Sequence, residues 1–145
     1  MTVEICNYIE RPIKAKELMN LYNNVGWWEE RKEQDIDKML KQEGSVGAWK
    51  NDVLIGFARA VSDGKFRAYI EDVVIHKEFQ KLGIGTKLVS VTETAILATI
   101  ITNRANKKDA PNSASNITFI VFSLNVLVFP YVYPLYHLVQ LRLRE

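Results

Sequence analysis

Three consecutive apolar segments with a period of two residues constrain the fold of this chain more than any other feature. They span Ser45–Trp49, Val53–Val61 and Phe66–Ile75, and the pairs Asn51–Asp52 and Asp63–Gly64 separate them. Alternation of this kind predicts β-strands, and polar turns this short join antiparallel neighbours. The sequence therefore predicts an antiparallel meander of three strands.

Helical spacing dominates the segments on either side of the meander. A short strand is predicted at Val3–Ile9, then a helix that begins near Pro12 and ends at Gly26, then a charged helix from about Glu29 to Glu43. A chain of 145 residues is long enough for one domain with a real core. We expect a single α/β domain, 1–145, with a mixed, largely antiparallel sheet flanked by helices. A further helix after the meander is indicated by apolar residues on one face at Ile84, Leu88, Val91 and Ala95.

Composition narrows the environment and excludes some partners. The formal charge of +2 is too small to indicate nucleic-acid binding. Cys6 is the one cysteine of the sequence, which excludes an internal disulfide and suits a reducing compartment. The first residues have no basic stretch followed by an apolar run, so we expect no signal peptide and a cytoplasmic protein. His76 and His137 lack the spacing of metal ligands, and no metal is predicted.

A glycine motif stands where the last strand of the meander gives way to a helix. Gln80, Gly83 and Gly85 form Gln-x-x-Gly-x-Gly. The start of a helix offers unpaired N–H groups and a partial positive charge, and glycines let a phosphate approach the backbone closely. A dinucleotide fingerprint would need glycine at Leu88, and a P-loop would need lysine at Thr86, so both are excluded. A pyrophosphate site and a ligand-free turn remain the two readings.

The context of this motif resembles a known family. "AYIEDVVIHKEFQKLGIGTKLV", Ala68 to Val89, is similar to the acetyl-coenzyme A binding core of the GNAT superfamily of N-acetyltransferases, whose signature is Q/R-x-x-G-x-G/A. "VLIGFARAVSDG", Val53 to Gly64, and "LYNNVGWW", Leu21 to Trp28, also resemble segments of small bacterial members. The resemblance covers about residues 3 to 100 and implies a GNAT-like fold.

The resemblance also implies where acetyl-coenzyme A would bind. Backbone N–H groups from about Leu82 to Thr86 would hold the pyrophosphate. The pantetheine arm would pair with the strand Val73–Ile75, which in the family splays from its parallel neighbour. An N–H group near Val74 would polarise the thioester carbonyl. The implied cofactor-binding residues are Val73, Val74, Ile75, Gln80, Lys81, Leu82, Gly83, Ile84, Gly85 and Thr86.

Two adjacent carboxylates are candidates for the base that deprotonates the acceptor amine. Strand alternation places Glu71 and Asp72 on opposite faces, so that one faces the acceptor while the other is structural or exposed, and Glu71 is favoured as the base. The loop holding Trp27 and Trp28 is where the family walls its acceptor site, so these residues either line an amine pocket or pack in the core.

The acid that reprotonates the thiolate is the point at which the resemblance fails. Many family members use a tyrosine on the last helix, in a phrase like F-Y-x-x-x-G-F. "PLYHLVQL" offers Tyr136 without the glycine and phenylalanine, and Pro130 and Pro134 would disrupt a helix. Tyr133 is an alternative alignment, and ordinary core packing is the alternative for both tyrosines.

The last third, residues 102–145, is atypical for the family. It contains no charged residue between Asp109 and Arg142, and residues 117–139 are long enough to span a bilayer. The prolines and the many Val, Phe and Tyr residues favour two strands instead, near Ile117–Leu124 and around Val126–Tyr133 or beyond, completing the sheet or a homodimer interface. A further interpretation is that the family pattern is lost from about Val91, as a shifted reading frame would cause.

The sequence therefore predicts an enzyme, an N-acetyltransferase that moves the acetyl group of acetyl-coenzyme A to a primary amine of a small molecule. The alternative is a non-catalytic GNAT-fold protein with a degraded C-terminal half that binds coenzyme A or a partner chain. Polyamines, arylalkylamines, aminosugar antibiotics and peptide N-termini all stay open as acceptors.

Overall fold

The computed structural model describes residues 2–27, 30–42, 44–63, 67–105, 117–123 and 135–141, with side chains through residue 100 apart from Gln42. A single sheet of six strands runs through it in the order β1-β2-β3-β4-β5-β6. The elements are β1 (Glu4–Asn7), α1 (Ala15–Val25), α2 (Glu33–Gln42), β2 (Gly44–Lys50), β3 (Val53–Ser62), β4 (Arg67–Ile75), the 3₁₀ turn η1 (Lys77–Phe79), α3 (Ile84–Ala105), β5 (Ile117–Ser123) and β6 (Leu135–Leu141).

The predicted meander is present as β2, β3 and β4, which pair antiparallel in sequence order. Asn51 and Asp52 both have positive φ, 48° and 63°, and join β2 to β3 directly. Two left-handed residues in a two-residue hairpin turn match the right-handed twist of the flanking strands. The β4–β5 pair is parallel, whereas the other neighbouring strands are antiparallel. The mixed, largely antiparallel sheet predicted from the sequence is confirmed.

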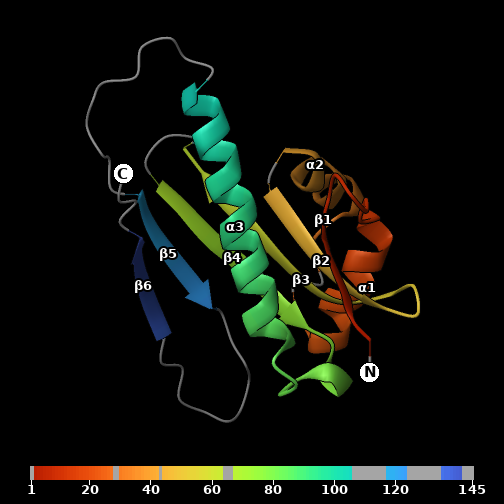
Figure 1. Ribbon diagram of the computed structural model, residues 1–145. Helices are drawn as coiled ribbons and strands as arrows, with labels where there is room; N and C mark the ends of the chain where they lie inside the picture. The colour runs from red at the N-terminus through yellow and green to blue at the C-terminus, as the bar shows by residue number, and fades with distance from the viewer. Residues whose placement is uncertain are drawn as a thin grey trace.

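Helices cover both faces of this sheet (Figure 1). Alternation along β3 divides its side chains between them: Phe57 packs in a cluster with residues of α1 and α2, and Ala58 packs in a second cluster with Leu88 of α3. Both Phe57 and Leu88 are fully buried. Helix α1 ends at Gly26, as predicted, because this residue adopts φ 78° and its N–H bonds back to the carbonyl of Asn23.

A glycine on β3 allows α3 to lie close to the sheet. A Cβ atom at Gly56 would come within 2.9 Å of both Ile75 Cδ1 and Leu88 Cδ1. A side chain there would displace the ends of the Ile75 and Leu88 side chains and crowd Cβ of Ala48, 3.3 Å away. Gly56 thus leaves the space that Ile75 of β4 and Leu88 of α3 fill beside the candidate site.

The C-terminal third contributes two strands, as the sequence predicted. β5 agrees with the predicted first strand, and β6 begins at Leu135, just beyond the predicted second strand, whose residues 126–133 lie outside the described part of the chain. Among the helices of the described residues, none is long and apolar enough to cross a membrane. The reading of residues 117–139 as one membrane helix is therefore wrong where the structure describes them, since β5 and β6 lie there.

Candidate active site

The glycine motif forms a sharp turn between β4 and α3. The carboxamide Nε2 of Gln80 donates to the carbonyl of Ile75 at 3.0 Å and ties the turn to the end of β4. Lys81 and Gly83 both adopt left-handed conformations, with φ 62° and 76°. Gln80, predicted as a cofactor-binding residue, thus has a structural contact that explains its place in the motif.

The start of α3 leaves backbone N–H groups available to an anion. The N–H group of Lys87 donates to the carbonyl oxygen of Gly83 at 3.2 Å, at the start of the helix. The N–H groups of the first helical turn have no carbonyl within the helix to bond. Lys81 and Lys87 are exposed beside them, and Leu82 is 54% exposed. The turn therefore combines unpaired donors, the positive end of a helix and two lysines.

The glycines of this turn are not required by packing within the protein. A Cβ at Gly83 would meet no atom within 4 Å, and one at Gly85 would meet only Ile75 Cγ1, at 3.9 Å. Gly83 is needed for its positive φ, but Gly85 is not. A glycine whose missing side chain would touch nothing leaves room for a ligand to reach the backbone. The residues of the turn fit the pyrophosphate of coenzyme A.

The parallel strands β4 and β5 pair over only part of their length. Their register runs from Arg67 with Thr118 to Ile70 with Val121. Residues 71–75 of β4 continue without a β5 partner in the described part of the chain, whereas β3 still pairs with Val74 and Ile75 on the other side. An edge of β4 opens where the pantetheine arm was predicted to pair.

A β-bulge lies at the point where the two strands separate. Arg59 pairs with Glu71 and Phe57 pairs with Val74, so Asp72 and Val73 together lie opposite one residue of β3. Asp72 has φ 53°. Such a bulge interrupts strand alternation and redirects the following backbone groups. The bulge thus interrupts the regular alternation from which opposite faces were predicted for Glu71 and Asp72.

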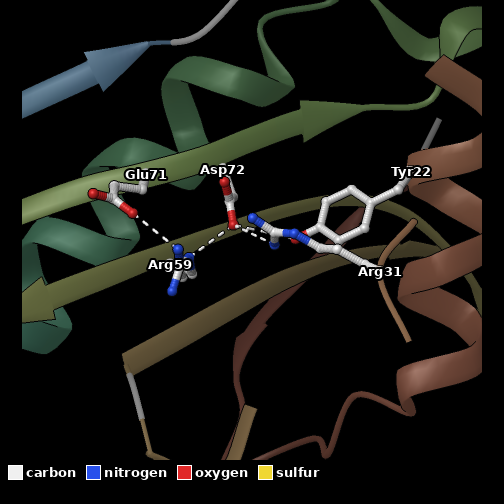
Figure 2. Close-up of polar contacts among 5 residues, drawn as sticks. All are labelled: Tyr22, Arg31, Arg59, Glu71 and Asp72. Atoms are coloured by element: carbon white, nitrogen blue, oxygen red, sulfur yellow. Dashed lines mark hydrogen bonds and ion pairs between the residues drawn. The ribbon is translucent and has the colours of Figure 1, made fainter. Parts of the chain in front are cut away.

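Both carboxylates contact the same arginine (Figure 2). Nε of Arg59 donates to Oδ2 of Asp72 at 2.7 Å, and Nη2 of Arg59 donates to Oε2 of Glu71 at 2.9 Å. The Arg59 side chain is 14% exposed, that of Asp72 is 7% exposed and that of Glu71 is 39% exposed. Arg59 thus bridges the two carboxylates that are the candidate bases.

Asp72 accepts hydrogen bonds from two further donors, one on α1 and one in the connection between α1 and α2. Nη1 of Arg31, between α1 and α2, and the hydroxyl of Tyr22, on α1, each lie 3.4 Å from its Oδ2. Burial and the negative charge of Asp72 raise the pKa of the Tyr22 hydroxyl, which therefore stays protonated. Sequence analysis missed both residues in this role. Tyr22 belonged to the apolar stripe of a predicted helix, and Arg31 was one charge among many in a charged segment.

The aromatic residues of the α1–α2 connection are only partly described. The Trp27 ring stacks with Tyr22 at a centroid separation of 6.3 Å and is partly buried against the α1–α2 core cluster. Trp27 thus lies beside the residue that contacts Asp72, on the predicted acceptor side. Trp28 lies outside the described residues.

The predicted acid is not on a helix. Tyr136 belongs to β6, opposite Phe122 of β5, so β5 separates its backbone from β4. Its side chain, like the whole of Tyr133, lies outside the described part of the structure. Within the described residues no group of three or more His, Cys, Asp or Glu side chains is placed to hold a metal.

A strand that separates from its parallel neighbour at a bulge and then turns into a helix through a glycine motif is the arrangement that the resemblance to GNAT acetyltransferases implied. The acetyltransferase (GNAT) family model matches residues 14–108, more than half of the chain. This chain belongs to the GNAT family. The match passes Val91, the residue from which the family pattern was expected to be lost.

Relatives of similar sequence carry the name N-acetyltransferase and are described as uncharacterized. The uncharacterized N-acetyltransferase ycf52 of Porphyra purpurea is 44% identical over 78 residues, which cover 50% of this chain and 44% of that protein. A ycf52-like protein of Prochlorococcus marinus is 37% identical over 87 residues, or 55% and 47% of the two chains. The match spans about half the length of these relatives.

Solved structures agree on the fold. A probable acetyltransferase from meticillin-resistant Staphylococcus aureus superimposes with a TM-score of 0.59 at 21% identity, covering 68% of this chain and 71% of that one. An aminoglycoside 6'-N-acetyltransferase complexed with coenzyme A gives a TM-score of 0.59 at 19% identity, covering 85% and 62%. At these identities the likeness concerns the fold.

Proposed function

We propose that this protein is an N-acetyltransferase that transfers acetyl from acetyl-coenzyme A to a primary amine of a small molecule. The observation that carries the proposal is the opening between β4 and β5 beyond Ile70, which leads from the bulge at Asp72 to the exposed glycine turn. Acetyl-coenzyme A has a thioester at one end of an extended arm and a pyrophosphate further along it. It therefore needs an open strand edge that leads to an anion-binding turn.

The binding of acetyl-coenzyme A follows from groups already described. The N–H groups at the start of α3, with Lys81 and Lys87, would hold the pyrophosphate. The unpaired edge of β4 at Val73–Ile75 would hydrogen-bond the pantetheine arm. An N–H group just after the bulge, near Val74, would polarise the thioester carbonyl as negative charge develops on its oxygen.

Glu71 is the proposed base for the acceptor amine. It is the more exposed of the two carboxylates, at 39%, and contacts one arginine, whereas Asp72 is buried among several donors. A carboxylate that takes the ammonium proton, directly or through water, leaves a neutral amine to attack the carbonyl carbon. The C–N bond forms, the C–S bond breaks, and the thiolate leaves. Tyr136 stays the predicted donor of the proton that the thiolate takes up. Trp27 and Trp28 stay the predicted walls of the amine site.

A second candidate function is binding of coenzyme A without turnover. It is favoured by the position of the predicted acid on a strand and by the end of the family match at residue 108. Because the cofactor-binding elements precede that point, they can be complete while the acid is not.

Calorimetric titration with acetyl-coenzyme A tests the site, and a thiol-release assay over a panel of amines tests turnover. Gly83→Glu should abolish binding, because it puts bulk and negative charge at the pyrophosphate. Gly26→Glu is the matched control, since Gly26 has nearly the same φ, 78° against 76°, and neither position has an atom within 4 Å of an added Cβ. Its affinity for acetyl-coenzyme A should match that of wild type.

Three outcomes separate the two candidates. Binding with thiol release, lowered about tenfold or more in Tyr136→Phe, supports the enzyme and its acid. Binding without thiol release for any amine supports the non-catalytic protein. No binding by the folded wild-type protein contradicts both.

A further inference from the structure

One atom of Asp72 joins the strand that would hold the thioester to the segment that would hold the acceptor. Its Oδ2 lies 2.7 Å from Arg59 Nε on β3 and 3.4 Å from both the Tyr22 hydroxyl on α1 and Arg31 Nη1 before α2. Figure 2 shows these donors converging on the carboxylate from different elements. A buried carboxylate is held this way only where several donors compensate its lost hydration.

The backbone of the same residue is in an unusual conformation. Asp72 has φ 53°, a region that residues other than glycine, asparagine and aspartate seldom occupy. Residues in such conformations persist when their surroundings hold them there. The ion pair with Arg59 is the short contact that ties this residue to β3 at the bulge. Val73 and Val74 follow at once, and the N–H group proposed to polarise the thioester carbonyl lies near Val74.

We propose that Asp72 is a positioning residue, whose carboxylate keeps β4 bulged through Arg59 and fixes the α1–α2 connection to that bulge through Arg31. This inference rests on the proposed acetyl transfer and assigns the two adjacent carboxylates different tasks. Glu71 exchanges a proton with the amine. Asp72 touches no reacting atom and sets where the thioester and the amine meet.

The two contacts predict separable effects. The Arg59 contact lies at the bulge, so its loss should move the thioester-polarising N–H group and lower kcat. The Arg31 contact is longer and comes from the α1–α2 connection, so its loss should loosen the acceptor side and raise the KM for the amine. Neither contact involves the glycine turn, so any rise in the Kd for acetyl-coenzyme A should be far smaller than the loss of binding expected for Gly83→Glu.

Two substitutions of Asp72 distinguish the carboxylate from the backbone. Asp72→Asn keeps the shape and tolerates a left-handed φ, but it lacks the charge. Asp72→Gly adopts that φ freely and lacks every side-chain contact. We expect kcat to fall about tenfold in Asp72→Asn and more in Asp72→Gly, whereas Arg31→Gln should raise the amine KM several-fold with kcat within about twofold.

Asp37→Asn is the matched control for the loss of an aspartate charge from an ion pair. Asp37 pairs with Lys41 at 2.6 Å on the exposed surface of α2, away from the bulge. The same chemical change there should leave kcat, the amine KM and the Kd unchanged. An equal fall of kcat in this control would show that the assay responds to general destabilisation and would overturn the assignment.

Amide hydrogen exchange provides a readout that does not depend on turnover. Asp72→Gly should speed exchange of the amides of Phe57 and Val74, which pair across the β3–β4 ladder beside the bulge, about tenfold or more relative to wild type, with the α3 amides near Leu88 unchanged. Full kcat and unchanged exchange in Asp72→Gly would overturn the proposal. If wild type acetylates no amine, the proposed function fails, and the exchange result still decides whether the carboxylate holds the bulge.

Discussion

Arg59 on β3 bridges the neighbouring carboxylates Glu71 and Asp72, with contacts of 2.9 and 2.7 Å. The same guanidinium therefore links an exposed carboxylate to a buried one. Because Arg59 contacts both carboxylates, substitutions of Glu71, Asp72 and Arg59 should differ in their effects on catalysis and stability.

Replacing Glu71 should affect catalysis more than binding. Glu71→Gln preserves an oxygen that accepts from Arg59 but has no basic carboxylate. We expect kcat to fall about 10²-fold to 10⁴-fold, because a general base contributes on that order. The Kd for acetyl-coenzyme A, measured by calorimetry, should not change. A kcat within twofold of wild type would remove Glu71 as the base.

Replacing Arg59 should destabilise the fold in addition to lowering kcat. Arg59→Met leaves the Asp72 carboxylate, 7% exposed, without its shortest ion pair. Removing one partner of a buried pair costs about 3–5 kcal/mol in the free energy of unfolding. Urea denaturation monitored by tryptophan fluorescence measures this loss. Lys41→Met, which breaks the exposed pair with Asp37, should lower the urea midpoint far less than Arg59→Met does.

Replacement by alanine should change the stability of the protein at one of two glycines near Ile75 and not at the other. Gly56→Ala places a methyl group 2.9 Å from Ile75 Cδ1 and Leu88 Cδ1, so it should lower the free energy of unfolding by about 1–3 kcal/mol. Gly85→Ala meets only Ile75 Cγ1, at 3.9 Å, and should not destabilise the protein. Its methyl group should weaken acetyl-coenzyme A binding. Equal stability of the two variants would contradict the close approach of α3 at Gly56.

Tyr22 should make stability depend on pH in the alkaline range. Burial and the charge of Asp72 raise the pKa of Tyr22 in the folded state above its ordinary value of 10.0. The stability that its neutral form contributes is complete below pH 10 and is lost as the pH rises toward the folded-state pKa, because only the unfolded state then ionises. The expected slope is about 1.4 kcal/mol per pH unit. Urea midpoints between pH 8 and 11 should fall more steeply for wild type than for Tyr22→Phe, and parallel curves would contradict this assignment.

The sequence predicted the elements whose period and punctuation are local. The meander, the end of α1 at Gly26 and the start of α3 on the glycines all follow from nearest-neighbour preferences. Boundaries were less accurate: the charged helix begins at Glu33 and not at Glu29. Residues 29–35 are all charged or polar, so no apolar residue in this stretch marks where the helix begins.

The site was predictable only where it is made of backbone. The glycine turn and the open edge of β4 followed from the motif and its resemblance. The bulge did not, because Asp72 has an ordinary strand sequence on both sides and its left-handed φ leaves no mark in that local sequence. Tyr22 and Arg31 are separated from it by 50 and 41 residues, a distance that no local pattern spans.

The four residue pairs between β4 and β5, Arg67 to Ile70 with Thr118 to Val121, are a short seam between the family-matched part and the strands after residue 108. Any strand that satisfies the hydrogen bonds along those four residues of β4 can complete the sheet at this edge. In evolutionary terms, the glycine turn and the buried network around Asp72 lie wholly within the family-matched part, so a change of the terminal strands replaces only the partner at this seam.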